Sequence, residues 1–257
     1  MINDKRIVVV MPAFNAEKTL EQTCAEIPRE YVDDIILVDD GSDDSTAILA
    51  RKLGLHTLEH EHNLGYGANQ KTCYREALRL NADIVVMVHP DYQYSPKLVV
   101  SLAALVASGH YDIALGSRII GAGSIKGGMP KYKYLANRIL TLIQNICLNT
   151  KLSEYHTGFR AFSSEILRSL PLEENSNDFV FDNEILCQAL YLRYRIGEIS
   201  CPTRYLPTSS SISFARSMIY GVGVLLVTFK FLAARCGIMK PKIFKQNGRC
   251  LDEQNSP

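Results

Sequence analysis

Short apolar runs alternate with amphipathic stretches along the first half of the chain. Runs of four or five mostly apolar residues lie at 7–11, 35–38, 84–88 and 113–116. Runs of this length between turn formers are typical of strands buried on both faces of a sheet. Helical spacing fills the intervals, at 17–27, 46–53, 63–80 and 96–108. With a shorter strand at 57–59, the alternation predicts βαβ units and an α/β fold, a mostly parallel sheet flanked by helices.

The pattern changes after Arg118, where glycines and a proline form a loop at 121–130. Beyond this loop the apolar spacing predicts two more helices, at 134–148 and 181–192, and two more strands, at 155–162 and 198–205. The length allows one large α/β domain or one domain plus an appendage, and we place the domain at 1–215.

The most apolar stretch of the chain is 217–234. It approaches the ~18 residues needed to span a bilayer, but Lys230 lies inside it and two arginines flank it. Three arrangements stay open: a helix packed on the sheet domain, one lying in a membrane interface, and a spanning helix. We expect an apolar helix at 216–240 that suits a membrane interface, followed by a flexible polar tail at 241–257.

Composition narrows the classes of function. The net charge of the 257 residues is +1, so no overall field favours nucleic acid. Seven cysteines are scattered without a CxxC pair, and this odd number favours free thiols in a reduced, cytosolic compartment. The first apolar run is too short for a signal sequence, so we expect no targeting segment.

Acidic side chains follow two of the predicted strands. Asp39 and Asp40 come at the end of the second run, and Asp91 and Gln93 follow the run at 84–88. The carboxyl ends of parallel strands form the crevice where open α/β sheets bind ligands. Carboxylates there suit nucleotide hydroxyls, base N–H groups or a divalent cation on phosphates.

Six segments resemble, in order, the motifs of family-2 glycosyltransferases. They are Val8–Ala16, Val38–Thr46, Asn63–Gly67, His89–Pro96, Gly116–Arg118 and Thr157–Arg160. The resemblance covers residues 5 to 215 and implies a GT-A fold, a nucleotide-activated sugar donor and inversion at the anomeric carbon. The last two motifs are most similar to those of dolichyl-phosphate mannose synthases and bacterial polyprenyl-phosphate glycosyltransferases.

By this resemblance the first loop lines the nucleoside, through Pro12, Ala13, Phe14 and Asn15. One of Asp39 and Asp40 contacts the base or ribose, and the other orients the loop. The competing interpretation is helix capping by Asp40 or Ser42, which accounts for one residue and not for the whole run.

The same resemblance makes Asp91 the ligand of a divalent cation, Mg²⁺ or Mn²⁺, with Gln93 in support. The cation stabilises charge on the departing diphosphate, and a carboxylate with phosphate oxygens is a usual set for Mg²⁺. The alternative for Asp91 is a turn residue beside Pro90. His89 stands where the family has a second Asp. It either ligates the metal as neutral imidazole, which favours Mn²⁺, or contacts the sugar or a phosphate.

The resemblance implies that two arginines, Arg118 and Arg160, bind the phosphates of the donor or the acceptor. The guanidinium fork suits phosphate, and a structural ion pair is the alternative for each. The basic pair that lipid-phosphate synthases carry near 202–214 is missing here, with Thr208 and Phe214 at its positions. Arg204 or Arg216 is the candidate substitute.

The acidic segment Phe181–Glu184 resembles the one before the acceptor-side helix of the family. We therefore place Asp182 and Glu184 with Asp91 and Arg118 as the predicted catalytic residues. A carboxylate here acts as general base toward a hydroxyl acceptor, whereas a phosphate acceptor is already ionised and needs little base. The structural alternative is an acidic first turn of a helix.

The sequence thus predicts inverting sugar transfer from a nucleotide sugar to a polyprenyl phosphate, in cell-envelope biogenesis. The protein is expected to be cytoplasmic and peripheral on the inner face of the cell membrane, where an amphipathic helix with Lys131 and Lys133 at its start also suits the interface. Two alternatives stay open: transfer to a hydroxyl of a glycan or envelope precursor, and a degenerate nucleotide-sugar-binding protein without activity. No nucleic-acid partner is expected, and a homo-oligomer is compatible with the sequence.

Overall fold

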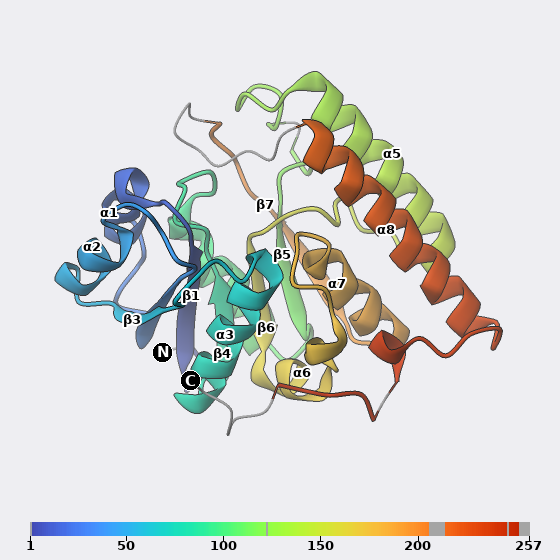
Figure 1. The fold of residues 1–257 in the computed structure, drawn as a ribbon, viewed down its shortest axis with the longest axis horizontal. Coiled ribbons are helices and arrows are strands. Elements are labelled where there is room, and N and C mark those ends of the chain that lie inside the picture. The colour runs from blue at the N-terminus through green and yellow to red at the C-terminus, as the bar shows by residue number, and fades with distance from the viewer. Residues whose placement is uncertain (1, 122, 206–213, 246, 252–257) are drawn as a thin grey trace.

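Seven strands form one sheet in the computed structural model, which describes residues 2–121, 123–205, 214–245 and 247–251. The strand order is β3-β2-β1-β4-β6-β5-β7. The strands are β1 (Ile7–Ala13), β2 (Asp34–Asp39), β3 (His56–Glu59), β4 (Ile84–Met87), β5 (Ile113–Ser117), β6 (Arg160–Ser163) and β7 (Ile196–Ser200). Neighbouring strands are parallel except at β6, so the predicted α/β fold with a mostly parallel sheet is confirmed (Figure 1).

The reversed strand β6 carries a motif to the edge of the sheet where ligands are expected. It is antiparallel to both β4 and β5, and its first residue, Arg160, pairs with Met87 and Leu115. The Thr157–Arg160 segment therefore enters the sheet beside the carboxyl ends of β4 and β5. The segments after β1, β2 and β4 reach the same edge because those strands are parallel.

Helices cover both faces of the sheet. They are α1 (Glu17–Ala25), α2 (Thr46–Lys52), α3 (Tyr66–Arg79), α4 (Val99–Ala107), α5 (Lys131–Leu148), α6 (Ser164–Ser169), α7 (Phe181–Tyr191) and α8 (Phe214–Arg235), with 3₁₀ turns η1 (Pro96–Leu98), η2 (Leu172–Glu174) and η3 (Lys242–Phe244). Alternate residues of β1 enter two separate cores. Val8 and Val10 pack with α3, α6 and α7, whereas Val9 and Met11 pack with α1 and α4. This two-sided burial explains the uninterrupted apolar run.

Helices α5 and α8 lie side by side along one edge of the molecule (Figure 1). The side chain of Gln144 in α5 donates to Thr228 Oγ1 in α8 at 3.3 Å. A Cβ added at Gly221 would meet Leu140 at 3.9 Å, so the two helices pack closely over several turns. One face of α8 is thereby covered by protein.

The predicted boundaries need correction in the second half of the chain. Helix α5 begins at Lys131, directly after Pro130, and β6 begins only at Arg160. Strand β7 ends at Ser200, two residues before Pro202, which has no N–H to continue a ladder. The position of Thr208 lies outside the described residues.

The prediction of a flexible polar tail is wrong for its described part. Ile243 and Phe244 are buried in a cluster with α7 and α8, and Leu251 is buried in one of the two main cores. Their apolar side chains pack because the end of α8 returns the chain to the sheet domain.

Candidate active site

The loop after β1 is held by the loop after β2. The Asn15 N–H donates to Ser42 Oγ at 2.8 Å, and Asn15 Oδ1 accepts from the Asp43 N–H at 3.0 Å. Asn15 has a φ of 52°, in the left-handed region that asparagine tolerates. The neighbouring Phe14 is half-exposed, which leaves an aromatic ring at the edge of the site. The remaining predicted nucleoside residues, Pro12 and Ala13, are buried in β1.

Asp39 is buried at the end of β2 and holds this second loop. Its carboxylate accepts from the backbone N–H of Ser42 at 3.0 Å and from the Ser42 hydroxyl. Ser42 in turn holds Asn15. Asp39 therefore fixes both loops of the expected nucleoside site.

Asp40 holds the turn that precedes α3. Its carboxylate accepts from the N–H groups of Leu64 and Gly65 at 2.9 and 3.0 Å, and it lies 2.7 Å from Nδ1 of His60. Gly65 has a φ of 102°, and a Cβ there would lie 2.6 Å from the Asn177 carbonyl. The turn can thus press against the segment before α7 only because it contains glycine.

His89, at the end of β4, is bound to the first residue of α3. Its Nε2 lies 3.0 Å from the hydroxyl of Tyr66, and the two rings stack at 5.6 Å. A Cβ at Gly158 would lie only 2.3 Å from the same nitrogen. Burial lowers the pKa of His89 against the opposing charges of Asp91 and Asp182, so the imidazole is neutral at pH 7. Because Nε2 is paired with Tyr66, the geometry does not support metal ligation through that atom.

Asp182 continues this hydrogen-bonded chain from His89. The Tyr66 hydroxyl donates to Asp182 Oδ2 at 2.8 Å, and Gln70 Nε2 donates to Oδ1 at 3.0 Å. Arg160 adds an ion pair at 3.6 Å. Burial and the charge of Asp182 raise the pKa of Tyr66, which therefore stays protonated as the donor. The structure thus joins two predicted site residues, His89 and Asp182, through a tyrosine that sequence reasoning missed.

Glu184 is bonded elsewhere. Its Oε2 accepts from the Ser176 N–H at 2.7 Å, in the loop before α7. Burial raises the pKa of Glu184, against its hydrogen bond from Ser176. Glu184 therefore fixes a loop. It does not belong to the hydrogen-bond network that joins His89, Tyr66 and Asp182.

Arg118 is held by a carboxylate that the sequence analysis did not single out. Glu154 is fully buried and accepts from Arg118 Nε at 2.8 Å, from the Arg118 N–H at 2.9 Å and from Asn137 Nδ2 at 2.7 Å. Burial alone raises the pKa of Glu154, but Arg118 more than offsets this, so the pKa lies below its usual range. Arg118 also donates to the carbonyl of His156 at 2.6 Å and to the hydroxyl of Tyr205 at 3.2 Å. The available signal was a glutamate three residues before the Thr157–Arg160 motif.

Arg160 does not face the site as a phosphate ligand. Its side chain is 0% exposed, and its guanidinium donates to the carbonyls of Thr157, Asp182 and Tyr155 at 2.7, 2.6 and 3.1 Å. The interpretation that Arg160 grips a phosphate is therefore corrected to the structural alternative. Its bonds fix the start of β6 against the start of α7.

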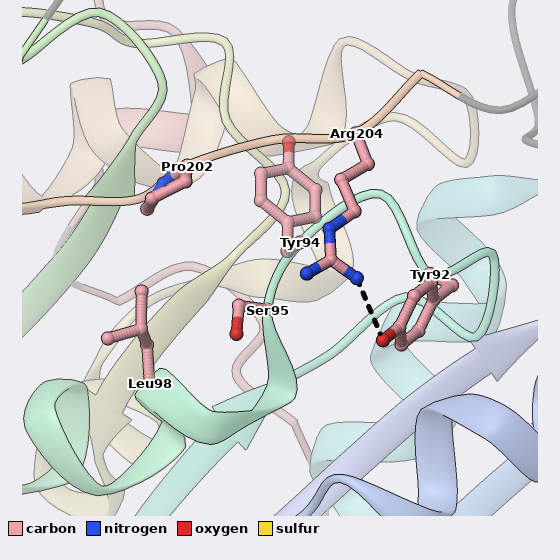
Figure 2. A pocket seen from close by; sticks show the side chains of 6 residues that line it. All are labelled: Tyr92, Tyr94, Ser95, Leu98, Pro202 and Arg204. Atoms are coloured by element: carbon pink, nitrogen blue, oxygen red, sulfur yellow. Dashed lines mark hydrogen bonds between the residues drawn. The ribbon is translucent and has the colours of Figure 1, made fainter. Parts of the chain in front are cut away.

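Arg204 lines a pocket of about 200 Å³ beside the loop after β4 (Figure 2). Its guanidinium lies over the ring of Tyr92, 5.4 Å from the centroid, and donates to the Tyr92 hydroxyl at 3.0 Å. Its backbone N–H donates to the Gln93 carbonyl at 2.9 Å. The remaining lining residues are Tyr94, Ser95, Leu98 and Pro202. Arg204 thus lies next to the predicted metal loop, separate from Arg118 and its glutamate.

A cation at this site would depend on few protein ligands. Within the described ranges, no three His, Cys, Asp or Glu side chains gather as a metal site. Asp91 is partly exposed in the loop after β4, where its Oδ1 accepts from the Gln93 N–H at 3.1 Å. One carboxylate fits a divalent cation whose other ligands are diphosphate oxygens and water.

Comparison with known protein families matches residues 8–170 to glycosyl transferase family 2. An uncharacterized protein of Methanocaldococcus jannaschii is 31% identical over 224 residues, which are 87% of this chain and 91% of that protein. The UDP-N-acetylglucosamine–dolichyl-phosphate N-acetylglucosaminyltransferase of Methanococcus voltae is 27% identical over 219 residues, 79% of this chain and 87% of that protein. The dolichyl-phosphate hexose transferase of Haloferax volcanii is 27% identical over 200 residues, 77% and 82% of the two chains.

Solved structures share the fold. Glucosyl-3-phosphoglycerate synthase from Mycobacterium tuberculosis in complex with UDP superposes with a TM-score of 0.70 at 22% identity, covering 92% of this chain and 82% of that one. The same enzyme with Mn²⁺, UDP and glucosyl-3-phosphoglycerate gives 0.64 at 21% identity over the same shares. The fold, the ordered motifs and the family match lead to one conclusion: this chain is a glycosyltransferase with the GT-A fold and belongs to glycosyl transferase family 2.

Proposed function

We propose that the protein transfers a sugar, with inversion, from a nucleoside-diphosphate sugar to a polyprenyl phosphate at the cytoplasmic face of a membrane. The names of two relatives, each covering more than three quarters of this chain, support a dolichyl-phosphate acceptor. The observation that carries the proposal is a broad apolar face on α5 and α8, next to the polar centre that contains Arg118 and Asp182.

The apolar face consists of two stripes of large exposed side chains. Those on α5 are Leu135, Ile139, Leu142 and Ile146, which are 50–72% exposed at spacings of four, three and four residues. Those on α8 are Met218, Val222, Leu225 and Phe229, which are 43–61% exposed at the same helical spacing. Soluble monomers rarely leave so large a contiguous apolar area in water. A lipid surface is the partner that matches it, and an apolar acceptor tail would lie along it.

The arrangement of α8 favours lying in the interface over crossing the membrane. By length and composition alone, residues 215–235 would suffice to span. However, Val224, Val227 and Phe231 are buried against the protein on the other side of the helix. Lys131 and Arg235, at the ends of the two helices, suit lipid headgroups.

The chemistry needs no strong base. A phosphate acceptor is largely ionised at neutral pH; its oxygen attacks C1 of the sugar, the bond from C1 to the diphosphate oxygen breaks, and the nucleoside diphosphate leaves with the electron pair. A divalent cation held by Asp91 supplies charge stabilisation for that leaving group. By analogy with the UDP complexes of the fold relatives, the base of the nucleotide sugar is proposed to be uracil. Phe14 and Asn15 would line the nucleoside. Arg118 is placed to meet a phosphate only at its exposed edge, since its side chain is 13% exposed.

The test is a panel of nucleotide sugars with a short prenyl phosphate, with and without Mn²⁺ or Mg²⁺, measuring nucleotide release and the glycolipid product. We expect metal-dependent product with at least one donor. No product with any prenyl phosphate, together with transfer to a sugar or glycerol hydroxyl, would replace this proposal by the hydroxyl-acceptor alternative. In that case Asp182→Asn should abolish turnover, whereas a phosphate acceptor leaves substantial activity in this variant.

A further inference from the structure

The apolar helix α8 reaches the polar centre through one side chain. The hydroxyl of Tyr220 lies 2.8 Å from Nδ1 of His156, and the two rings meet edge to face at 5.6 Å. The helix residues next to Tyr220, Ile219 and Met218, are 67% and 57% exposed. Tyr220 therefore stands where the apolar face meets the interior of the site.

The other nitrogen of His156 is unsatisfied. Nε2 is buried and has no hydrogen-bond partner among the residues that the structure describes. An unpaired buried polar atom costs about 1–3 kcal/mol, and in native proteins such atoms usually receive a partner from water or a ligand. A ligand atom that forms a hydrogen bond with Nε2 of His156 would remove this cost.

His156 lies beside Arg118, which is expected to contact a phosphate of the donor or the acceptor. Its carbonyl accepts from Arg118 Nη2 at 2.6 Å. Burial lowers the pKa of His156 to about 4, with opposing effects from Glu154 and Arg118 and smaller ones from Arg160 and Asp182. The imidazole is consequently neutral, and one of its nitrogens carries a proton while the other does not.

We infer that His156 binds the phosphate of the lipid acceptor through Nε2–H, with Tyr220 as the positioning residue that donates to Nδ1 and so selects this tautomer. The inference rests on the proposed polyprenyl-phosphate acceptor and adds two residues to its site. Because Nε2 is buried, the proposal requires side chains around it to move when the phosphate binds, while Tyr220 keeps its bond to Nδ1. The tail of the acceptor then follows the exposed stripe of α8 while its phosphate lies beside Arg118.

Two substitutions of His156 distinguish the contribution of Nε2 from that of Nδ1. The amide of glutamine reproduces a donor near Nε2, whereas that of asparagine reaches only the position of Nδ1. We expect His156→Asn to raise the KM for a short prenyl phosphate about tenfold or more, as for a lost hydrogen bond to a charged group. His156→Gln should raise it less. In both, the KM for the prenyl phosphate should rise much more than the KM for the nucleotide sugar.

Tyr220→Phe is the second variant, and it keeps the ring and the apolar packing. It should raise the acceptor KM by a smaller factor, with the donor KM unchanged, and its thermal unfolding should confirm that α8 remains packed. An acceptor KM that is unchanged in His156→Asn, or donor and acceptor KM values that rise together in all three variants, would overturn the inference. A wild-type enzyme that glycosylates no prenyl phosphate would instead overturn the proposed function, and this outcome is visible before any variant is made.

Discussion

The guanidinium of Arg118 and the carboxylate of Glu154 form a buried ion pair at the centre of the site. Glu154 is fully buried and Arg118 nearly so, and further bonds from Asn137 and to His156 complete the pair. Ion pairs of this kind add little net stability, but removal of one partner leaves an uncompensated charge in the interior. The pair therefore fixes the position of the Arg118 side chain after β5.

Glu154→Gln should lower the free energy of unfolding by about 3–5 kcal/mol, because it leaves the Arg118 charge buried without a counter-ion. Urea unfolding followed by circular dichroism measures the change. The matched control is Glu59→Gln, whose partner Arg51 is exposed at the surface; it should cost less than about 1 kcal/mol. Similar losses in both variants would show that the buried pair has no special role.

The fold and the edge of the sheet that carries the site follow from sequence pattern alone. Apolar runs locate β1, β2, β4 and β5, and parallel pairing brings the segments around Asp39 and Asp91 to one edge. The partners of these residues could not be predicted, because hydrogen bonds between segments a hundred residues apart depend on how helices dock. Tyr66 and Asp182 are such a pair.

Arg160 shows why motif membership does not settle a role. The motif places an arginine at the start of β6, and the family resemblance assigns it a phosphate contact. Because β6 is antiparallel and central, its first side chain enters the interior, where three carbonyls accept its protons. The direction of a strand is set by the whole topology and is not readable from four residues.

His89→Gln should leave the apparent affinity for Mn²⁺ unchanged, since Nε2 of His89 is bonded to Tyr66. Asp91→Asn should require much more Mn²⁺ and lower turnover about 100-fold or more, because a charge-stabilising group on the leaving diphosphate is lost. Titration of nucleotide release with Mn²⁺ measures both. If His89→Gln lowered the apparent affinity for Mn²⁺ as strongly as Asp91→Asn, the imidazole would be a metal ligand.

Gly158→Ala should destabilise the protein by about 1–3 kcal/mol, because the new methyl group would lie 2.3 Å from Nε2 of His89. Gly123→Ala is the control, since a Cβ there meets nothing within 4 Å. The double variant with His89→Ala should recover part of the loss by removing the ring. Strict additivity of the two substitutions in a double-mutant cycle would contradict this contact.

His156 should make stability depend on pH between about 6.5 and 4. Its pKa is about 4 in the folded protein, so in this window the unfolded chain binds the proton and the folded chain does not. Stability is therefore retained above the unfolded pKa and lost as the pH falls toward the folded one, by at most about 3 kcal/mol. His156→Gln should flatten this part of the unfolding profile, whereas the exposed His110→Gln should not. Parallel profiles for wild type and His156→Gln would show that His156 is accessible to protons in the folded state.

The exposed apolar face of α5 and α8 should bind the protein to lipid vesicles. Leu142 on α5 and Phe229 on α8 are 60% and 61% exposed, and burial of such side chains in lipid stabilises binding by about 1.5–3 kcal/mol each. The double variant Leu142→Ser, Phe229→Ser should therefore reduce sedimentation with anionic phospholipid vesicles at least about tenfold. Ile48→Ser, on α2 and 56% exposed, removes a similar apolar side chain from a different helix and should bind vesicles as the wild type does. Equal losses in the two variants would mean that binding is general stickiness of exposed apolar groups, and normal binding of the double variant would mean that α5 and α8 face another partner.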